Sequence, residues 1–443
     1  MNADSLRRTL IFLALAAALV ASVVYDSYYV QTNAEFQVPI AGLIAASFAA
    51  VFFLQQYPER TIQTVLLAGW PLHLFTLVFF WACFAIHRGS GIGQFVSYTV
   101  FAYATYLLVP LVFLLDHRQF VAFVKAVAVV SALLAVPSFV GSAGIESFLG
   151  VPLRVKFSYA EFSGIAASAG LFEHAEGHAF QMAIGMFCSW YAWRRTGNLW
   201  YIACLLLSFG GLVVAQGRAA IFGVVLAGLF MVLPRIFRRS FPLFAVTTTL
   251  VLIAPYLVLT QLAALPGISG YFRLERGLSG RGEAWRYAID LIEEKPWTGH
   301  GFLASSKLTE DQKKELRKSG FSGAGTTFHN TYLSKAVDLG LIVTAVYCLL
   351  YLIPFIHVCR PTSFPLEQIL VRSMLLLTLT TSIYRDYNIG GVRSTAMMGA
   401  IFFGIANLWP WVNAWHEAVP AVERRKWMAD GILGGQWRTE PSS

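Results

Sequence analysis

Charged side chains are scarce in this sequence of 443 residues. Asp, Glu, Lys and Arg make up 13% of it and hydrophobic residues 57%, and the mean hydropathy is +0.61. In a typical soluble domain, charged residues make up about a quarter of the sequence. The shortage of charge excludes a soluble globular protein and leaves no room for a separate soluble domain. The sequence therefore predicts an all-α integral membrane protein.

Cysteine is also rare, and all five cysteines fall in or beside apolar runs. The polar segments show no pairing pattern, so the sequence predicts neither a disulfide nor a metal site built from cysteine. The five are Cys83, Cys188, Cys204, Cys348 and Cys359.

Long apolar runs dominate the sequence. A helix needs about 20 residues to cross the hydrocarbon core of a bilayer, and twelve runs are candidates for such helices. The first run lacks a small-residue cleavage site and further spans follow it, so we interpret it as a retained helix rather than a signal peptide. The runs are residues 9–25, 37–54, 64–86, 95–115, 120–140, 178–193, 199–215, 219–234, 241–262, 332–356, 367–384 and 391–412.

The runs divide the chain into four parts. Transmembrane helices 1 to 9 occupy residues 1–262, a polar loop with amphipathic helices occupies 263–331, helices 10 to 12 occupy 332–413, and a tail occupies 414–443. Arg and Lys cluster in the connections that this order places on the side of the N-terminus, which the positive-inside rule makes cytoplasmic. The tail is then cytoplasmic and the large loop faces outward. The net charge of +9 follows from the same bias, so we expect no nucleic-acid partner.

A polytopic transporter, including a flippase for lipid-linked sugars, is the main alternative. Such transporters tend to show internal repeats and ionisable groups near mid-membrane. The two halves of this sequence show no repeat, and its long loop follows the ninth run. The few charges within runs lie near predicted helix ends, where snorkelling explains them, and Lys335 and Asp338 have the i, i+3 spacing of a helical pair. These charges are Lys125, Lys335, Asp338 and Arg372.

The large loop has internal order. Residues 281–294 carry a helical stripe of apolar side chains at Trp285, Ala288, Ile289 and Ile292 and end before Pro296, which predicts an amphipathic helix on the outer membrane face. A capping-box pattern predicts a second helix over 309–320. Residues 297–302 read as a turn, and the glycine-rich stretch 320–325 reads as a hinge that would let this second helix move.

Three short motifs follow one another on the predicted outer face. The first, residues 216–220, contains Arg218 and opens a helix; the second, residues 279–301, contains Arg281; the third, residues 329–333, begins with His329. In this order, and with a large outer loop after the ninth helix, they resemble the bacterial O-antigen ligase and O-antigen polymerase superfamily of integral-membrane glycosyltransferases. The resemblance covers roughly residues 210–345 and is topological elsewhere.

The resemblance implies the reaction and its partners. It implies transfer of a glycan from undecaprenyl diphosphate to an acceptor hydroxyl in cell-surface polysaccharide assembly, at the periplasmic face of the bacterial inner membrane. It implies no nucleotide-sugar donor, no obligatory metal and no other cofactor. The acceptor is either a lipid A core sugar or another lipid-linked glycan. The essential arginines of the family map onto Arg218 and Arg281, and its histidine maps onto His329.

These residue types suit the chemistry independently of the resemblance. A guanidinium can donate two parallel hydrogen bonds to phosphate oxygens, and it keeps its charge. Arg218 and Arg281 are therefore candidates for binding the departing diphosphate. The N-terminus of the helix that begins near Arg218 adds to an anion site. An imidazole is suited to accept a proton from a sugar hydroxyl near neutral pH, which makes His329 the candidate base. Attack opposite the leaving group inverts the anomeric carbon.

Further residues are expected to support the site. Glu283 and Asn330 lie within the motifs, Arg385 and Asp386 lie at the outer end of the eleventh helix, and Arg154 lies in the outer loop 141–177. The same loop places His174 and His178 at i, i+4 after Glu173, a spacing that ligates metals on helices. No further ligand is indicated, so we interpret these three residues as a polar helix start.

The motifs leave the acceptor open. Ligases and polymerases share the leaving group and the base, and a protein O-glycosyltransferase with a Ser or Thr acceptor is a third enzyme reading. A flippase would instead need a continuous polar path and access to both sides of the membrane.

Overall fold

We describe the protein from a computed structural model. It describes residues 3–55, 66–86, 92–156, 166–232, 281–308, 328–359, 365–385 and 389–411. The predicted ninth helix, 241–262, the second loop helix, 309–320, and the hinge, 320–325, lie outside these ranges.

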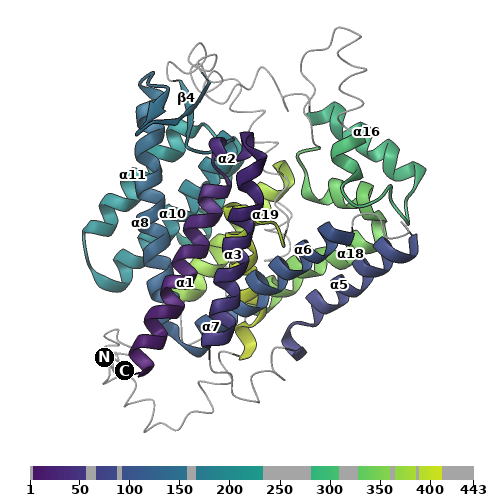
Figure 1. Cartoon of the computed structure of the whole chain (residues 1–443), viewed down its shortest axis with the longest axis horizontal. Coiled ribbons are helices and arrows are strands. Elements are labelled where there is room, and N and C mark those ends of the chain that lie inside the picture. Colours follow the sequence, from purple (N-terminus) through teal and green to yellow (C-terminus); the bar gives the residue numbers. More distant parts are fainter. Residues whose placement is uncertain are drawn as a thin grey trace.

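The protein is mostly helical (Figure 1). Two π-helical turns, η1 and η2, interrupt otherwise regular helices. The helices, in chain order, are α1 Ala3–Tyr25, α2 Tyr28–Thr32, α3 Ala34–Leu54, α5 Trp70–Trp81, η1 Ala82–Ile86, α6 Ile92–Tyr103, η2 Ala104–Leu108, α7 Val109–Leu115, α8 His117–Ser142, α10 Ala175–Thr196, α11 Trp200–Ala215, α12 Arg218–Val232, α16 Arg281–Glu294, α18 Thr331–Val358, α19 Pro365–Tyr384 and α20 Ser394–Asn407.

Eleven of the twelve predicted spans correspond to helices in the described part of the chain, and the twelfth falls outside it. Six helical stretches there are long and apolar enough to cross a membrane, and four shorter apolar helices accompany them. The chain is therefore a multi-pass membrane protein, and the count of twelve stays a prediction.

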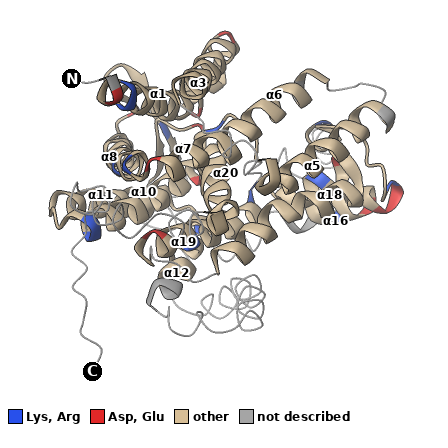
Figure 2. Cartoon of the chain, turned by 90° about the horizontal axis from the view of Figure 1, so that it is seen from below, with Lys and Arg blue, Asp and Glu red and all other residues tan. Residues whose placement is uncertain are grey.

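Two groups of helices stand apart in Figures 1 and 2. In the first, α8, α10 and α11 pack against one another; in the second, α5 packs against α18. Helix α19 joins them, because it packs on α10 and α12 as well as on α18. Figure 2 shows most of the ribbon without charge, as expected where helices face lipid and one another.

The segment 141–177, predicted as an outer loop, holds short strands that the all-α prediction missed. Strands β1, Ser147–Phe148, and β2, Val151–Pro152, form one antiparallel pair. Strands β3, Arg154–Lys156, and β4, Ala167–Gly170, form another. Each strand has at most four residues, too few to show the alternation by which strands are recognised.

Helix α16 has the predicted bounds, and its buried face includes part of the predicted stripe, Ala288 and Ile292, but not Ile289. Ile289 is 47% exposed, whereas Leu291, outside the predicted stripe, is 7% exposed. Ala288, Leu291, Phe328 and Val337 form one buried apolar cluster. The helix packs on α18 and leaves Ile289 exposed, and its predicted place on the membrane face stays a prediction.

The prediction that the charges within the runs reach water by snorkelling is wrong for three of the four. Lys335, Asp338 and Arg372 are at most 5% exposed. Arg372 lies beside the end of α18, where its Nε and Nη2 donate to the carbonyl of Val358 at 2.9 and 2.7 Å. A cation there complements the partial negative charge of a helix C-terminus.

The predicted inner end of the bundle is held by a cluster around Glu367, at the start of α19. Its Oε1 accepts hydrogen bonds from the hydroxyl of Tyr191 at 2.7 Å and from Nη1 of Arg195 at 3.0 Å. The Nε2 of His117 lies 3.3 Å from the same oxygen. This inner cluster, Glu367 with Tyr191, Arg195 and His117, ties α19 to α10 and α8.

Candidate active site

His329 lies directly before α18, in a left-handed backbone conformation with φ of 51°. Asn330 is the N-cap of α18, and its Oδ1 accepts hydrogen bonds from the amides of Tyr332 and Leu333 at 2.9 and 3.0 Å. The cap fixes the first turn of the helix, and therefore also the position of the histidine that precedes it. Left-handed geometry at a non-glycine residue is uncommon and gathers at functional sites.

The start of α16 is fixed next to His329. Trp285, one turn after Arg281, donates its indole Nε1–H to the carbonyl of Phe328 at 2.8 Å. The same indole lies 6.4 Å, between ring centroids, from Tyr384 at the end of α19. The side chains of Arg281 and Glu283 lie outside the described part, so the helix backbone alone locates them.

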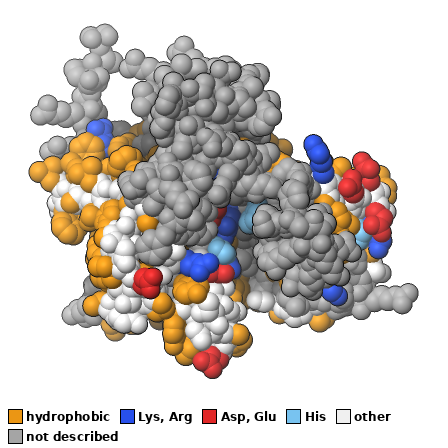
Figure 3. All heavy atoms as spheres, turned by 90° about the horizontal axis from the view of Figure 1, so that it is seen from above, with side chains coloured by type: hydrophobic (Ala, Val, Ile, Leu, Met, Phe, Trp, Pro, Cys, Tyr) orange, Lys and Arg blue, Asp and Glu red, His pale blue; other side chains and the backbone are white. Residues whose placement is uncertain are grey.

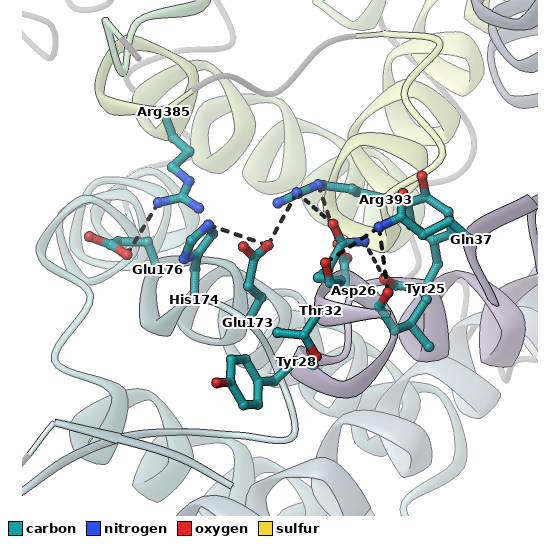
Figure 4. A network of polar contacts seen from close by, with 12 residues as sticks. Tyr25, Asp26, Tyr28, Thr32, Gln37, Glu173, His174, Glu176, Arg385 and Arg393 are labelled. Carbon is teal, nitrogen blue, oxygen red and sulfur yellow. Dashed lines mark hydrogen bonds and ion pairs between the residues drawn. The ribbon is translucent and has the colours of Figure 1, made fainter. Parts of the chain in front are cut away.

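Arg385 joins the His329 segment to α10. Its carbonyl accepts a hydrogen bond from Oγ1 of Thr331 at 2.9 Å, and its Nη1 lies 3.3 Å from Oε2 of Glu176, in the first turn of α10 (Figure 4). Asp386 lies outside the described residues. The guanidinium that the sequence placed near the site thus lies between the histidine segment and α10.

Gly217 brings the segment with Arg218 to the same turn of α10. A Cβ atom at Gly217 would overlap the Cβ of Ala179 and lie 3.6 Å from Cα of Glu176. Arg218, half-buried, is the first residue of α12. A series of contacts therefore runs from the Arg218 segment through Glu176 and Arg385 to Thr331. Two residues before Asn330, Phe328 continues it to the helix that carries Arg281.

A second polar network adjoins Glu176, and the sequence analysis missed two of its members, Arg393 and Asp26. Arg393 Nη2 lies 3.2 Å from Oε2 of Glu173, and Glu173 lies 3.4 Å from Nε2 of His174 (Figure 4). Asp26 Oδ2 accepts hydrogen bonds from the amide and hydroxyl of Ser394 at 2.8 and 2.5 Å. Both residues lie at the end of a predicted helix, and this position was the one signal in the sequence that could have pointed to them.

The burial of Asp26 changes its acidity. Loss of hydration raises the pKa of its carboxyl above the ordinary 3.8, while Arg393 and the hydrogen bonds from Ser394 act in the opposite direction. The effect of burial is the larger, as expected for a carboxylate taken out of water.

Arg154 lies on another part of this face. In β3, its guanidinium stands 5.1 Å from the ring centroid of Tyr28, at the start of α2. This contact ties Arg154 to α2 rather than to the series of contacts that links the three motifs.

The glutamate and histidines of the outer loop are not gathered around one point. Glu173 pairs with His174, whereas His178 is fully buried beside the ring of Phe172. Among the described residues, no three His, Cys, Asp or Glu side chains are grouped so as to hold a metal ion.

Basic, acidic and histidine side chains gather near the middle of the face seen in Figure 3, with hydrophobic margins beside them. The chain matches none of the curated proteins. Residues 203–348, which contain Arg218, Arg281 and His329, match the family model described as O-antigen ligase. This part of the chain is thus similar to the O-antigen ligase domain family.

Proposed function

We propose that this protein transfers a glycan from undecaprenyl diphosphate to a hydroxyl of an acceptor glycan. The family implies membrane glycan transfer of the O-antigen ligase or polymerase type. The observation that carries the proposal is the series of contacts that brings the Arg218, Arg281 and His329 segments to one end of the bundle.

In the proposed reaction, Arg218 and Arg281 bind the diphosphate and stabilise the charge that grows on it as the anomeric carbon–oxygen bond breaks. His329 accepts the proton of the attacking acceptor hydroxyl on the opposite face of the sugar. The new glycosidic bond forms as undecaprenyl diphosphate departs, so the anomeric configuration inverts. The backbone of Arg385 contacts Thr331, and its guanidinium, which pairs with Glu176, is proposed to add positive charge on the same side. Two or three guanidinium groups would supply the charge that a divalent cation supplies elsewhere.

The site is proposed to face the periplasm at the inner membrane. The lipid donor would lie with its diphosphate at the polar centre of this face and its prenyl chain along the apolar margin. Placement of two reactants at one surface converts their encounter into a step within one complex.

The decisive experiment supplies purified protein in liposomes with a defined undecaprenyl diphosphate glycan and two acceptors, a lipid A core and a second lipid-linked repeat. Extension of the core identifies a ligase, and extension of the second repeat identifies a polymerase. Extension of neither, in a correctly inserted protein, would contradict the proposal.

Substitutions at the site complete this test. His329→Ala should lower kcat by about 100-fold to 10,000-fold, the range for loss of a general base. Arg281→Ala should abolish transfer. Arg281→Lys should restore part of it, because lysine keeps the charge but cannot donate two parallel hydrogen bonds to the diphosphate. Lys307→Ala, at an exposed position of the same loop, is the control. Activity retained in the His329 or Arg281 alanine variant would remove that residue from the mechanism.

A further inference from the structure

Helix α18 is interrupted at Gly340, where φ is 82° and ψ is 170°. In an unbroken helix the amide of Leu341 would donate to the carbonyl of Val337. Here that amide donates to the carbonyl of Pro296 at 2.8 Å, and the carbonyl of Val337 accepts instead from the amide of His300 at 2.8 Å. Both halves of one helical hydrogen bond are thus replaced by residues 296–302, which we call the insert.

The insert satisfies a second backbone group at the break. The carbonyl of Asp338 accepts a hydrogen bond from the amide of Gly301 at 2.9 Å. Irregular backbone is tolerated at membrane depth only where other protein groups satisfy it. The insert is therefore part of α18 in terms of hydrogen bonding, although about 40 residues of sequence separate the two.

Two glycines allow this close approach. Gly299 has φ of 65° and Gly340 has φ of 82°. A Cβ atom at Gly299 would lie 2.6 Å from the amide nitrogen of Gly340, and one at Gly340 would collide with the carbonyl of Trp297. In each case the obstacle is backbone, which cannot move aside as a flexible side chain does.

Buried charges of α18 hold the insert and the residues after it. Asp338, 2% exposed, accepts a hydrogen bond on Oδ1 from the amide of Ser305 at 2.7 Å. The Nζ of Lys335, 3% exposed, lies 5.0 Å from the ring centroid of Tyr98 and 5.1 Å from that of Phe302. Buried charges are costly unless they have such partners.

The insert also continues directly from α16. The Nε2 of His300 lies 2.9 Å from the carbonyl of Leu291, in the last turn of α16. Ala288 and Leu291 of α16 pack against Val337 of α18, three residues before the break. The helix that begins at Arg281 and the helix that follows His329 are thus joined at both ends of α16, by Trp285 and by the insert.

We propose that the insert is a positioning element, and that Asp338 and Gly340 are positioning residues that hold the Arg281 helix at a fixed place relative to His329. This proposal rests on the proposed glycan transfer. It implies that α16 does not swing as a lid during the reaction, because movement would break the hydrogen bonds that complete α18.

The first test measures the geometry without any substrate. Spin labels are placed at Ile289→Cys on α16 and Leu352→Cys on α18, both exposed, in full-length protein whose five native cysteines are replaced by alanine. We expect one narrow distance distribution in the parent protein and a broad or shifted one after Gly340→Ala. Gly42→Ala is the matched control, since a Cβ atom there meets nothing within 4 Å.

The second test measures catalysis. Gly340→Ala should lower kcat by about 100-fold, the scale of a misplacement of about 1 Å, and by far more than it changes the KM for the lipid donor. Asp338→Leu should do the same, whereas Asp338→Asn keeps an oxygen that accepts from Ser305 and should restore most of the rate. A purely structural role would lower the amount of folded protein and leave the kcat of that protein unchanged.

The outcomes are separable. A broad distribution in the parent protein, or one that neither Gly340→Ala nor Asp338→Leu alters, would overturn the proposal. A wild-type kcat alongside a broadened distribution would equally overturn the positioning role. If the parent protein transfers no glycan, the proposed function fails, and the distance measurement still decides whether α16 and α18 form one rigid unit.

Discussion

At the scale of residues, Gln216 and His329 adopt the same uncommon conformation, with φ of 54° and 51°. Each lies two residues before the first residue of a helix of the candidate site, α12 or α18, and Gln216 is also the C-cap of α11. A left-handed residue at such a point turns the chain sharply into the helix that follows. Local strain of this kind persists only where the surrounding contacts fix it.

The pKa of Asp26 gives a testable pH dependence. The unfolded chain releases this proton near the ordinary pKa of 3.8, whereas burial in the folded protein raises the pKa. Between the two values the folded state binds more protons, so stability falls as the pH rises. This contribution is complete below 3.8 and is lost as the pH passes the folded pKa. Asp26→Asn removes the titration.

We therefore expect the unfolding temperature of Asp26→Asn to fall less than that of the wild type between about pH 4 and about pH 7. The measurement is thermal unfolding in detergent across this interval. Asp290→Asn, at an exposed position of α16, should follow the wild type. Parallel curves for wild type and Asp26→Asn would show that Asp26 does not titrate differently on folding.

At the scale of elements, the close approach of α12 to α10 determines where Arg218 lies. Gly217→Ala would drive a methyl group into Ala179 and displace the start of α12. We expect glycan transfer to fall by at least about tenfold, because displacement of one charge weakens stabilisation of the leaving group. Gly228→Ala, on the same helix, meets nothing within 4 Å and should leave transfer unchanged.

The readout is the kcat of purified protein, normalised to the folded fraction measured by size-exclusion chromatography. Equal rates for Gly217→Ala and Gly228→Ala would mean that the approach of α12 to α10 does not set the position of the arginine.

The helices could be predicted from sequence because hydrophobic length and helical periodicity are local. The bounds of α16 followed from its periodicity and from Pro296, and eleven predicted spans fall on helices. The buried charges could not be predicted, because the partners of Lys335 and Asp338 come from the insert, which only tertiary structure brings to Gly340. Arg385 was expected near the site, but Glu176 as its partner depends on packing between α10 and α19.

At the scale of the whole molecule, polar residues gather at two opposite ends of an apolar bundle. Arg8 pairs with Asp116 at 3.1 Å at one end, and Arg393 pairs with Glu173 at the other. The grouping of the predicted outer loops at one end supports a single outward-facing site. Which end faces the periplasm stays a prediction.

Labelling with a membrane-impermeant maleimide tests this orientation. Leu149→Cys, at an 89% exposed position between β1 and β2, should react in intact spheroplasts. Leu199→Cys, at a 70% exposed position between α10 and α11, should react only after the membrane is permeabilised. The wild type, whose cysteines in the described part are buried or half-buried, is the control. The reverse pattern would place the site in the cytoplasm and contradict the proposed reaction.

The inner cluster around Glu367 bears on the transporter alternative. A carrier that works by alternating access must part its helices on each side of the membrane in turn. Separation of α19 from α8 and α10 would remove Arg195 and Tyr191 from the carboxylate of Glu367. Loss of the partners of a buried charge costs about 3–5 kcal/mol. Alternating access would therefore be costly at this end of the bundle, which favours a proposed reaction in which both reactants enter and leave at the opposite end.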